Sequence, residues 1–174
     1  AMDTYTDRAK LIRQFAVENF LGHWDGYSGP IINNYFLRSN SKSVFTFLPW
    51  GADQTFGENR QTPELLDTYT FPMDKPDVGY PWIKLTHKTE TLERGLLFRK
   101  CLAYKPCQTL YLQQLKATSA KATAIKLPNL MANAGKVVDF LSNDNNRAEQ
   151  KRNSAFIAAQ HKAVAALLKQ YKIK

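Results

Sequence analysis

Two aspartates and one asparagine have the types and the order that a phosphoryl-transfer site requires. Asp25 lies in the segment WDGYSGP, Asn34 follows nine residues later, and Asp53 lies beyond a further apolar segment, in GADQTFG. Kinase-type enzymes carry a base, then an amide and then a metal-binding carboxylate in this order. Carboxylate and amide oxygens are hard ligands of the kind that Mg²⁺ prefers. The order therefore predicts Asp25 as the group that orients an attacking hydroxyl, and Asn34 and Asp53 as Mg²⁺ ligands.

Each of these residues also has an ordinary structural explanation. An aspartate that follows a helix is commonly a cap or a turn former. An asparagine in a loop commonly bonds to nearby backbone, and the adjacent Asn33 offers the same amide as Asn34. The residue types alone therefore leave the structural and the catalytic roles open.

The elements around these residues are expected to place the two acids side by side. Apolar residues recur at three- and four-residue steps over residues 6–22, which predicts an amphipathic helix. Residues 34–38 and 43–49 predict two short strands joined by a polar turn. Asp25 then follows the helix and Asp53 follows the second strand. We expect folding to bring their carboxyl groups close enough to share a divalent cation.

Several side chains near these acids have expected positions. Thr6 is the expected N-cap of the first helix. Glu18 is expected on the solvated face of that helix, with a buried, orienting acid as the alternative. Trp24, Trp50 and Phe56 are expected to pack around the site, with Trp50 in the core.

Four short motifs follow one another within residues 15–57. They are DGY at 25–27, NYFL at 34–37, PW at 49–50 and DQTFG at 53–57. Together they resemble the kinase-like family of spore coat protein H (CotH). Weaker likeness extends to about Lys169, so the resemblance covers most of the chain, and it corresponds to the later part of the family's domain.

The resemblance implies an α+β, mostly helical fold: the C-lobe of an atypical protein-kinase-like domain, with a small β-hairpin at the site. It implies transfer of the ATP γ-phosphate to serine, with ATP and Mg²⁺ as cofactors. The implied partner is a protein substrate or a separate N-terminal lobe, and the implied location is secreted or at the cell surface, as for spore coat-like proteins. In this comparison Asp25 corresponds to the catalytic acid, and Asn34 and Asp53 to the cofactor-binding and metal-binding residues.

The chain departs from the family pattern at one position. Many relatives carry an aspartate directly after the PW motif, where this chain has Gly51. If the metal ligand belongs at that position, the enzyme is inactive. If Asp53 serves instead, as in relatives with a WGxDQTF pattern, the site survives. The alternative to a kinase is therefore a catalytically inactive, secreted or surface-located binding or structural module.

Length and motif content limit what this chain does alone. Its 174 residues suit a single domain or lobe, divided into residues 1–57 with the motifs, a proline-rich arm over 58–88 and a helical bundle over 89–174. The phosphate-binding patterns GxGxxG and GKS/T are absent from the sequence. We therefore expect the 174-residue chain to bind nucleotide poorly by itself.

Charge is concentrated in the second half of the chain. Residues 99–174 carry 14 Lys or Arg and three acidic residues. Six of the lysines in this half are spread singly rather than clustered with interleaved aromatic residues, so we expect solvated helix faces and no nucleic-acid partner. They are Lys100, Lys105, Lys116, Lys121, Lys126 and Lys136. No apolar run reaches the roughly 20 residues of a membrane span, so no transmembrane segment is expected.

Cys101 and Cys107 flank a segment that contains Pro106. A disulfide between them is feasible if this segment turns instead of continuing as one helix, and two buried free thiols are the alternative. The resemblance favours the disulfide, because secreted CotH-like proteins carry similar cysteine pairs at this place. A disulfide also suits an exported protein.

Overall fold

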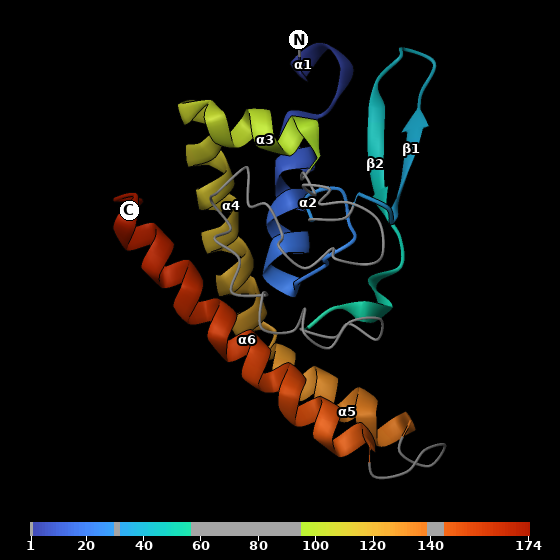
Figure 1. Cartoon of the computed structure of the whole chain (residues 1–174), viewed down its shortest axis with the longest axis vertical. Coiled ribbons are helices and arrows are strands. Elements are labelled where there is room, and N and C mark those ends of the chain that lie inside the picture. The colour runs from blue at the N-terminus through green and yellow to red at the C-terminus, as the bar shows by residue number, and fades with distance from the viewer. Residues whose placement is uncertain (1, 30–31, 57–94, 139–144) are drawn as a thin grey trace, which may run out of the picture.

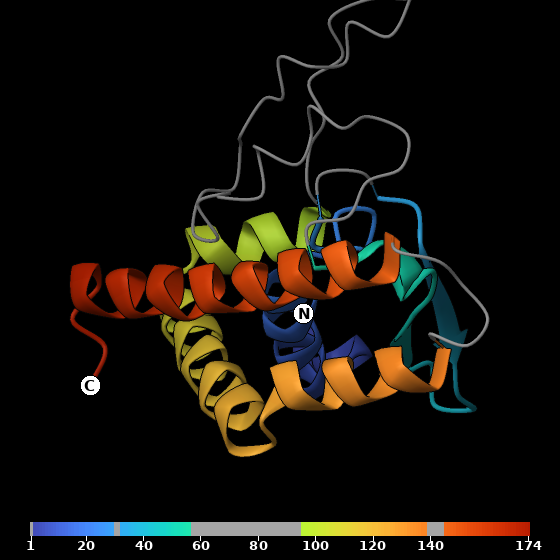
Figure 2. The ribbon, with the colours of Figure 1, turned by 90° about the horizontal axis from the view of Figure 1, so that it is seen from below.

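The computed structural model describes residues 2–29, 32–56, 95–138 and 145–174. This part of the chain is mostly helical with a two-stranded antiparallel sheet, consistent with the expected α+β class. In chain order the elements are α1 (Met2–Tyr5), α2 (Arg8–Leu21), β1 (Tyr35–Ser39), β2 (Phe45–Pro49), the 3-10 helix η1 (Ala52–Gln54), α3 (Leu96–Ala103), α4 (Lys105–Ala124), α5 (Leu127–Val138) and α6 (Asn145–Gln170). The hairpin and α4 lie on opposite sides of α2 (Figure 1). Helix α5 follows the end of α4, and the long α6 runs beside α5 and then crosses α4 (Figure 2).

Helix α2 is the central element, because its apolar residues are buried against α4. Its N-cap lies one residue later than predicted. The Asp7 side chain accepts a hydrogen bond from the Lys10 amide at 3.1 Å and caps the helix. The prediction of Thr6 as the cap is wrong: Thr6 forms a parallel bridge with Phe45 of the hairpin. Gly22 ends the helix in the left-handed conformation, with φ 70°.

The hairpin forms close to the predicted positions. Tyr35 pairs with Pro49 and Ser39 pairs with Phe45 in an antiparallel register. The Asn40 side chain closes the turn by accepting hydrogen bonds from the amides of Lys42 and Val44. Phe45 and Phe47 are half-buried while Thr46 and Leu48 are exposed, so alternate side chains of β2 face the core.

The core joins α2, α3, α4 and α6 through large side chains. The largest fully buried ones are Phe15, Phe20, Phe98, Tyr111, Ile12, Leu112, Leu115, Ile157 and Val164. The expectation of Trp50 in the core is wrong, because this residue is 61% exposed. Its ring instead packs edge-on against Phe36 on the outer face of the hairpin, at 5.6 Å between centroids. Trp24 is buried and Phe56 packs against the core, as expected.

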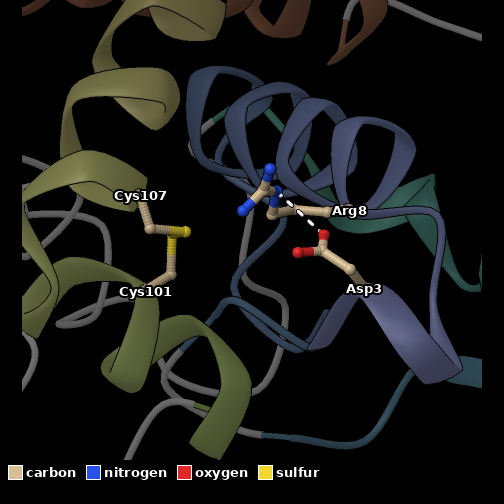
Figure 3. Close-up of a disulfide and its surroundings, with 4 residues drawn as sticks. All are labelled: Asp3, Arg8, Cys101 and Cys107. Atoms are coloured by element: carbon tan, nitrogen blue, oxygen red, sulfur yellow. Dashed lines mark ion pairs between the residues drawn. A yellow bond between two sulfur atoms is a disulfide. The ribbon is translucent and has the colours of Figure 1, made fainter. Parts of the chain in front are cut away.

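A disulfide joins Cys101 near the end of α3 to Cys107 in the first turn of α4 (Figure 3). Tyr104, between the two helices, has extended backbone angles, so the chain turns there rather than continuing as one helix. Both cysteines are buried in the core. The predicted disulfide is therefore present, and it holds α3 against α4.

Removing this cross-link should destabilise the fold without unfolding it. Closing so short a loop restricts the unfolded chain by about 2 kcal/mol. We expect Cys101→Ser combined with Cys107→Ser to lower the free energy of unfolding by about that amount in urea denaturation. The reduced wild-type chain is the matched control and should lose the same amount; a reduced wild type as stable as the oxidised one would contradict the prediction.

Two further expectations concern a membrane-spanning helix and the proline-rich arm. No helix within the described ranges is long and apolar enough to cross a membrane. The proline-rich arm expected over residues 58–88 lies outside the described residues.

Candidate active site

The segment that follows α2 is a buried turn. Every residue of His23–Gly29 is buried. Tyr27 anchors the turn, because its ring stacks on Phe15 at 5.8 Å and its hydroxyl accepts a hydrogen bond from the Leu97 amide at 3.1 Å. The turn that carries Asp25 is therefore fixed to α2 and to the start of α3.

Asp25 is bonded directly to the segment that leads into the hairpin. Its Oδ2 atom accepts a hydrogen bond from Nδ2 of Asn34. Its backbone carbonyl accepts from the amides of Asn33 and Asn34, at 3.1 and 2.6 Å. The structure thus brings together two of the three predicted site residues, Asp25 and Asn34.

Gly51 allows the loop after β2 to lie directly against the Asn34 side chain. A Cβ atom at position 51 would lie 2.2 Å from Asn34 Nδ2, and the glycine has a left-handed φ of 64°. The Trp50 amide also donates to the Asn34 carbonyl at 3.2 Å. A glycine at position 51 therefore fits both the left-handed backbone and the close approach to Asn34.

Asp53 lies on the exposed surface of η1, two residues beyond Gly51. The η1 loop is held at both ends, because Gly51 contacts Asn34 and the Phe56 amide donates to the Leu21 carbonyl at 2.7 Å. Asp53 is thereby carried on a loop fixed beside the Asp25 turn. In the described part of the chain, no group of three or more His, Cys, Asp or Glu is arranged to hold a metal ion.

His23 is a site residue that the sequence analysis missed. Its side chain is 3% exposed, and its Nε2 atom lies 3.2 Å from Asp25 Oδ1. Among the described residues neither atom has a hydrogen-bond partner of good geometry, so their contact is an ion pair rather than an aligned hydrogen bond. The available signal was the HWD motif, in which one residue separates the histidine from the aspartate.

The environment of His23 favours its charged form. Burial lowers the pKa of its imidazole. The Asp25 carboxylate, the Glu18 carboxylate and the Gly51 carbonyl together outweigh burial, so the pKa ends above its ordinary value.

Glu18 is not on a solvated helix face, so that expectation is wrong. It is 4% exposed, and its Oε2 atom accepts hydrogen bonds from the Ser28 amide at 3.1 Å and the Ser28 hydroxyl at 2.7 Å. Its Oε1 atom accepts from Gln14 at 2.7 Å. Glu18 is buried for a physical reason: the turn after α2 folds back onto the helix, and Ser28 of this turn donates its hydrogen bonds to the Glu18 carboxylate.

The oxygen atoms at this site fit a hard cation and a hydroxyl substrate. Asp25 Oδ1 is buried in an ion pair with His23, and within the described residues it accepts no hydrogen bond. Asn34 Oδ1 accepts a 3.2 Å bond from Asn33 and, as an amide oxygen, has a second lone pair. The exposed Asp53 adds a carboxylate. Neutral and charged oxygens of this kind are the protein ligands that Mg²⁺ takes alongside water.

Comparison with known proteins gives one match. The family model described as CotH kinase protein matches residues 1–173, which is essentially the whole chain. No curated protein and no solved structure matches. The recognition from sequence motifs is confirmed by this family match.

Proposed function

Because the chain belongs to the CotH kinase family, we propose that it forms the catalytic-acid part of an atypical protein kinase that transfers the ATP γ-phosphate to serine. One observation supports this most strongly. The buried Asp25 carboxylate has Oδ2 held by Asn34 and Oδ1 in an ion pair with His23, beside the loop that carries Asp53. A carboxylate oxygen has more than one lone pair, so a carboxylate fixed in this way suits a group that orients a hydroxyl.

In this proposal each residue has a separate task. Asp25 accepts a hydrogen bond from the serine hydroxyl through Oδ1 and directs the oxygen toward the phosphoryl group. Asn34 holds Asp25 Oδ2 with its amide nitrogen and would bind the metal with its amide oxygen, together with Asp53. Bound Mg²⁺ would neutralise the charge that develops on the transferred phosphoryl group.

The same proposal extends to architecture and location. The helical bundle with its hairpin corresponds to a kinase-like C-lobe, and ATP affinity would require a nucleotide-binding lobe as partner. The three-part division of the chain at residues 57 and 89 belongs to this proposal. A secreted or cell-surface location is supported by the buried disulfide, since disulfides persist in oxidising compartments.

The test is phosphate transfer by the full-length protein. With labelled ATP, Mg²⁺ and a serine-containing protein substrate, Asp53→Ala should reduce label incorporation by about 100-fold or more, because loss of a metal carboxylate removes several kcal/mol of charge stabilisation. Asp3→Ala is the matched control, since Asp3 is an exposed acid paired with Arg8 (Figure 3). Equal labelling by wild type and Asp53→Ala would refute the proposal and favour the inactive binding module.

A further inference from the structure

His23 is a costly residue to bury. An imidazole removed from water loses its hydration and must find polar partners inside the protein. At 4% exposure, the whole His23 residue sits in the turn between α2 and the hairpin. The residues that offset this cost are therefore expected to indicate what His23 does in the structure.

The partners of His23 come from three separate segments. Asp25 belongs to its own turn, and the ion pair to Oδ1 spans 3.2 Å. Gly51 belongs to the loop after β2, and its backbone carbonyl contributes to raising the pKa of the imidazole. Glu18 belongs to α2 and acts on His23 through its charge.

Two further features hold this arrangement in place. Gly26 leaves the space that His23 occupies, because a Cβ atom there would lie 2.6 Å from His23 Nδ1 and 3.2 Å from the Glu18 carboxyl carbon. Ser28 and Gln14 bind the Glu18 carboxylate, so its charge cannot swing away. The histidine therefore has a fitted cavity and a fixed counter-charge.

From this geometry we infer that His23 is a positioning residue that, together with Asn34, clamps the Asp25 carboxylate. The imidazole holds Asp25 Oδ1 from one side while Asn34 holds Oδ2 from the other. Because Asn34 also packs against Gly51, whose loop continues into η1, this clamp fixes the carboxylate relative to the loop that bears Asp53. The clamp stands on the contacts alone, whereas its catalytic consequence rests on the proposed phosphotransfer.

The clamp is tested without any reaction by NMR of the 174-residue chain. His23→Gln should shift the backbone amide signals of Gly51, Asn34 and Asp53, which come from a loop and a segment remote in sequence. Asp25→Asn should lower the pKa read from the His23 ring signals, because it removes a negative partner. His161→Gln is the matched control: this half-buried histidine bonds Ser119 at 2.7 Å, and its loss should leave the three amides unchanged.

The catalytic consequence is tested by kinetics of the full-length protein. His23→Gln should lower kcat by about 10- to 100-fold while KM for ATP changes less than about twofold, because a small misplacement of a catalytic group affects the reacting geometry rather than nucleotide binding. His23→Asn, which retains a side-chain amide but is shorter, should be no more active than His23→Gln.

The outcomes of these experiments distinguish the structural clamp made by His23 from its effect on the proposed phosphate transfer. Unchanged amide signals in His23→Gln together with an unchanged His23 pKa in Asp25→Asn would overturn the clamp. A wild-type protein that transfers no phosphate would refute the proposed function, and the NMR results would still decide the clamp. A kcat for His23→Gln equal to that of the wild type would overturn the positioning of Asp25 by His23.

Discussion

Asp25→Asn is expected to reduce phosphate transfer by about 10²- to 10⁴-fold, the range that a positioned general base contributes. The asparagine keeps the size of the side chain and one oxygen that can accept the hydrogen bond from Asn34. It removes the negative charge that faces His23 and the basic oxygen that would receive the serine proton. The measurement is kcat with labelled ATP at saturating Mg²⁺.

Stability must be measured on the same variant, because the substitution also breaks a buried ion pair. Leaving His23 without its partner removes part of the interaction that offsets its burial, so we expect a loss of about 1–3 kcal/mol in the free energy of unfolding. Asp3→Asn, at an exposed ion pair, should change neither quantity. Activity of folded Asp25→Asn within twofold of the wild type would contradict the catalytic role.

The helices and the hairpin were predictable because their patterns are local. The apolar period of α2 and the alternation in β2 each follow from which side chains face one core. The start of α2 was less predictable, since both Thr6 and Asp7 are good N-cap residues. The choice between them depends on a bridge from Thr6 to Phe45, which is distant in sequence. Periodicity carries no information about such a contact.

The candidate site was predictable only in part, for the same reason. Order along the chain indicated Asp25 and Asn34, which the fold brings into direct contact. Glu18 looked like a surface acid, because nothing local shows that Ser28 folds back onto it. Trp50 looked like a core residue by its size. It lies instead at the end of the hairpin, where it is exposed and its ring packs edge-on against Phe36.

Gly51→Ala tests whether the departure from the family pattern is a loss or a fitted feature. Alanine would have to adopt φ near 64°, which costs about 1–2 kcal/mol for a residue with a Cβ atom. That Cβ would also displace the Asn34 amide, which lies 2.2 Å from its position. We expect both a less stable protein and a fall in kcat of about 100-fold, since the Asn34–Asp25 hydrogen bond is disturbed.

Gly22→Ala separates these two effects. Gly22 has a similar left-handed φ of 70°, but its added Cβ would meet the ring of Phe156 on α6 at 2.6 Å rather than a site residue. This control should lose stability to a comparable degree while the folded fraction keeps its kcat. Gly51→Asp, which places a carboxylate directly after Trp50, should behave like Gly51→Ala, because the same Cβ meets the same amide. A rise in phosphate transfer in Gly51→Asp would instead show that position 51 needs a carboxylate and that Asp53 does not replace it.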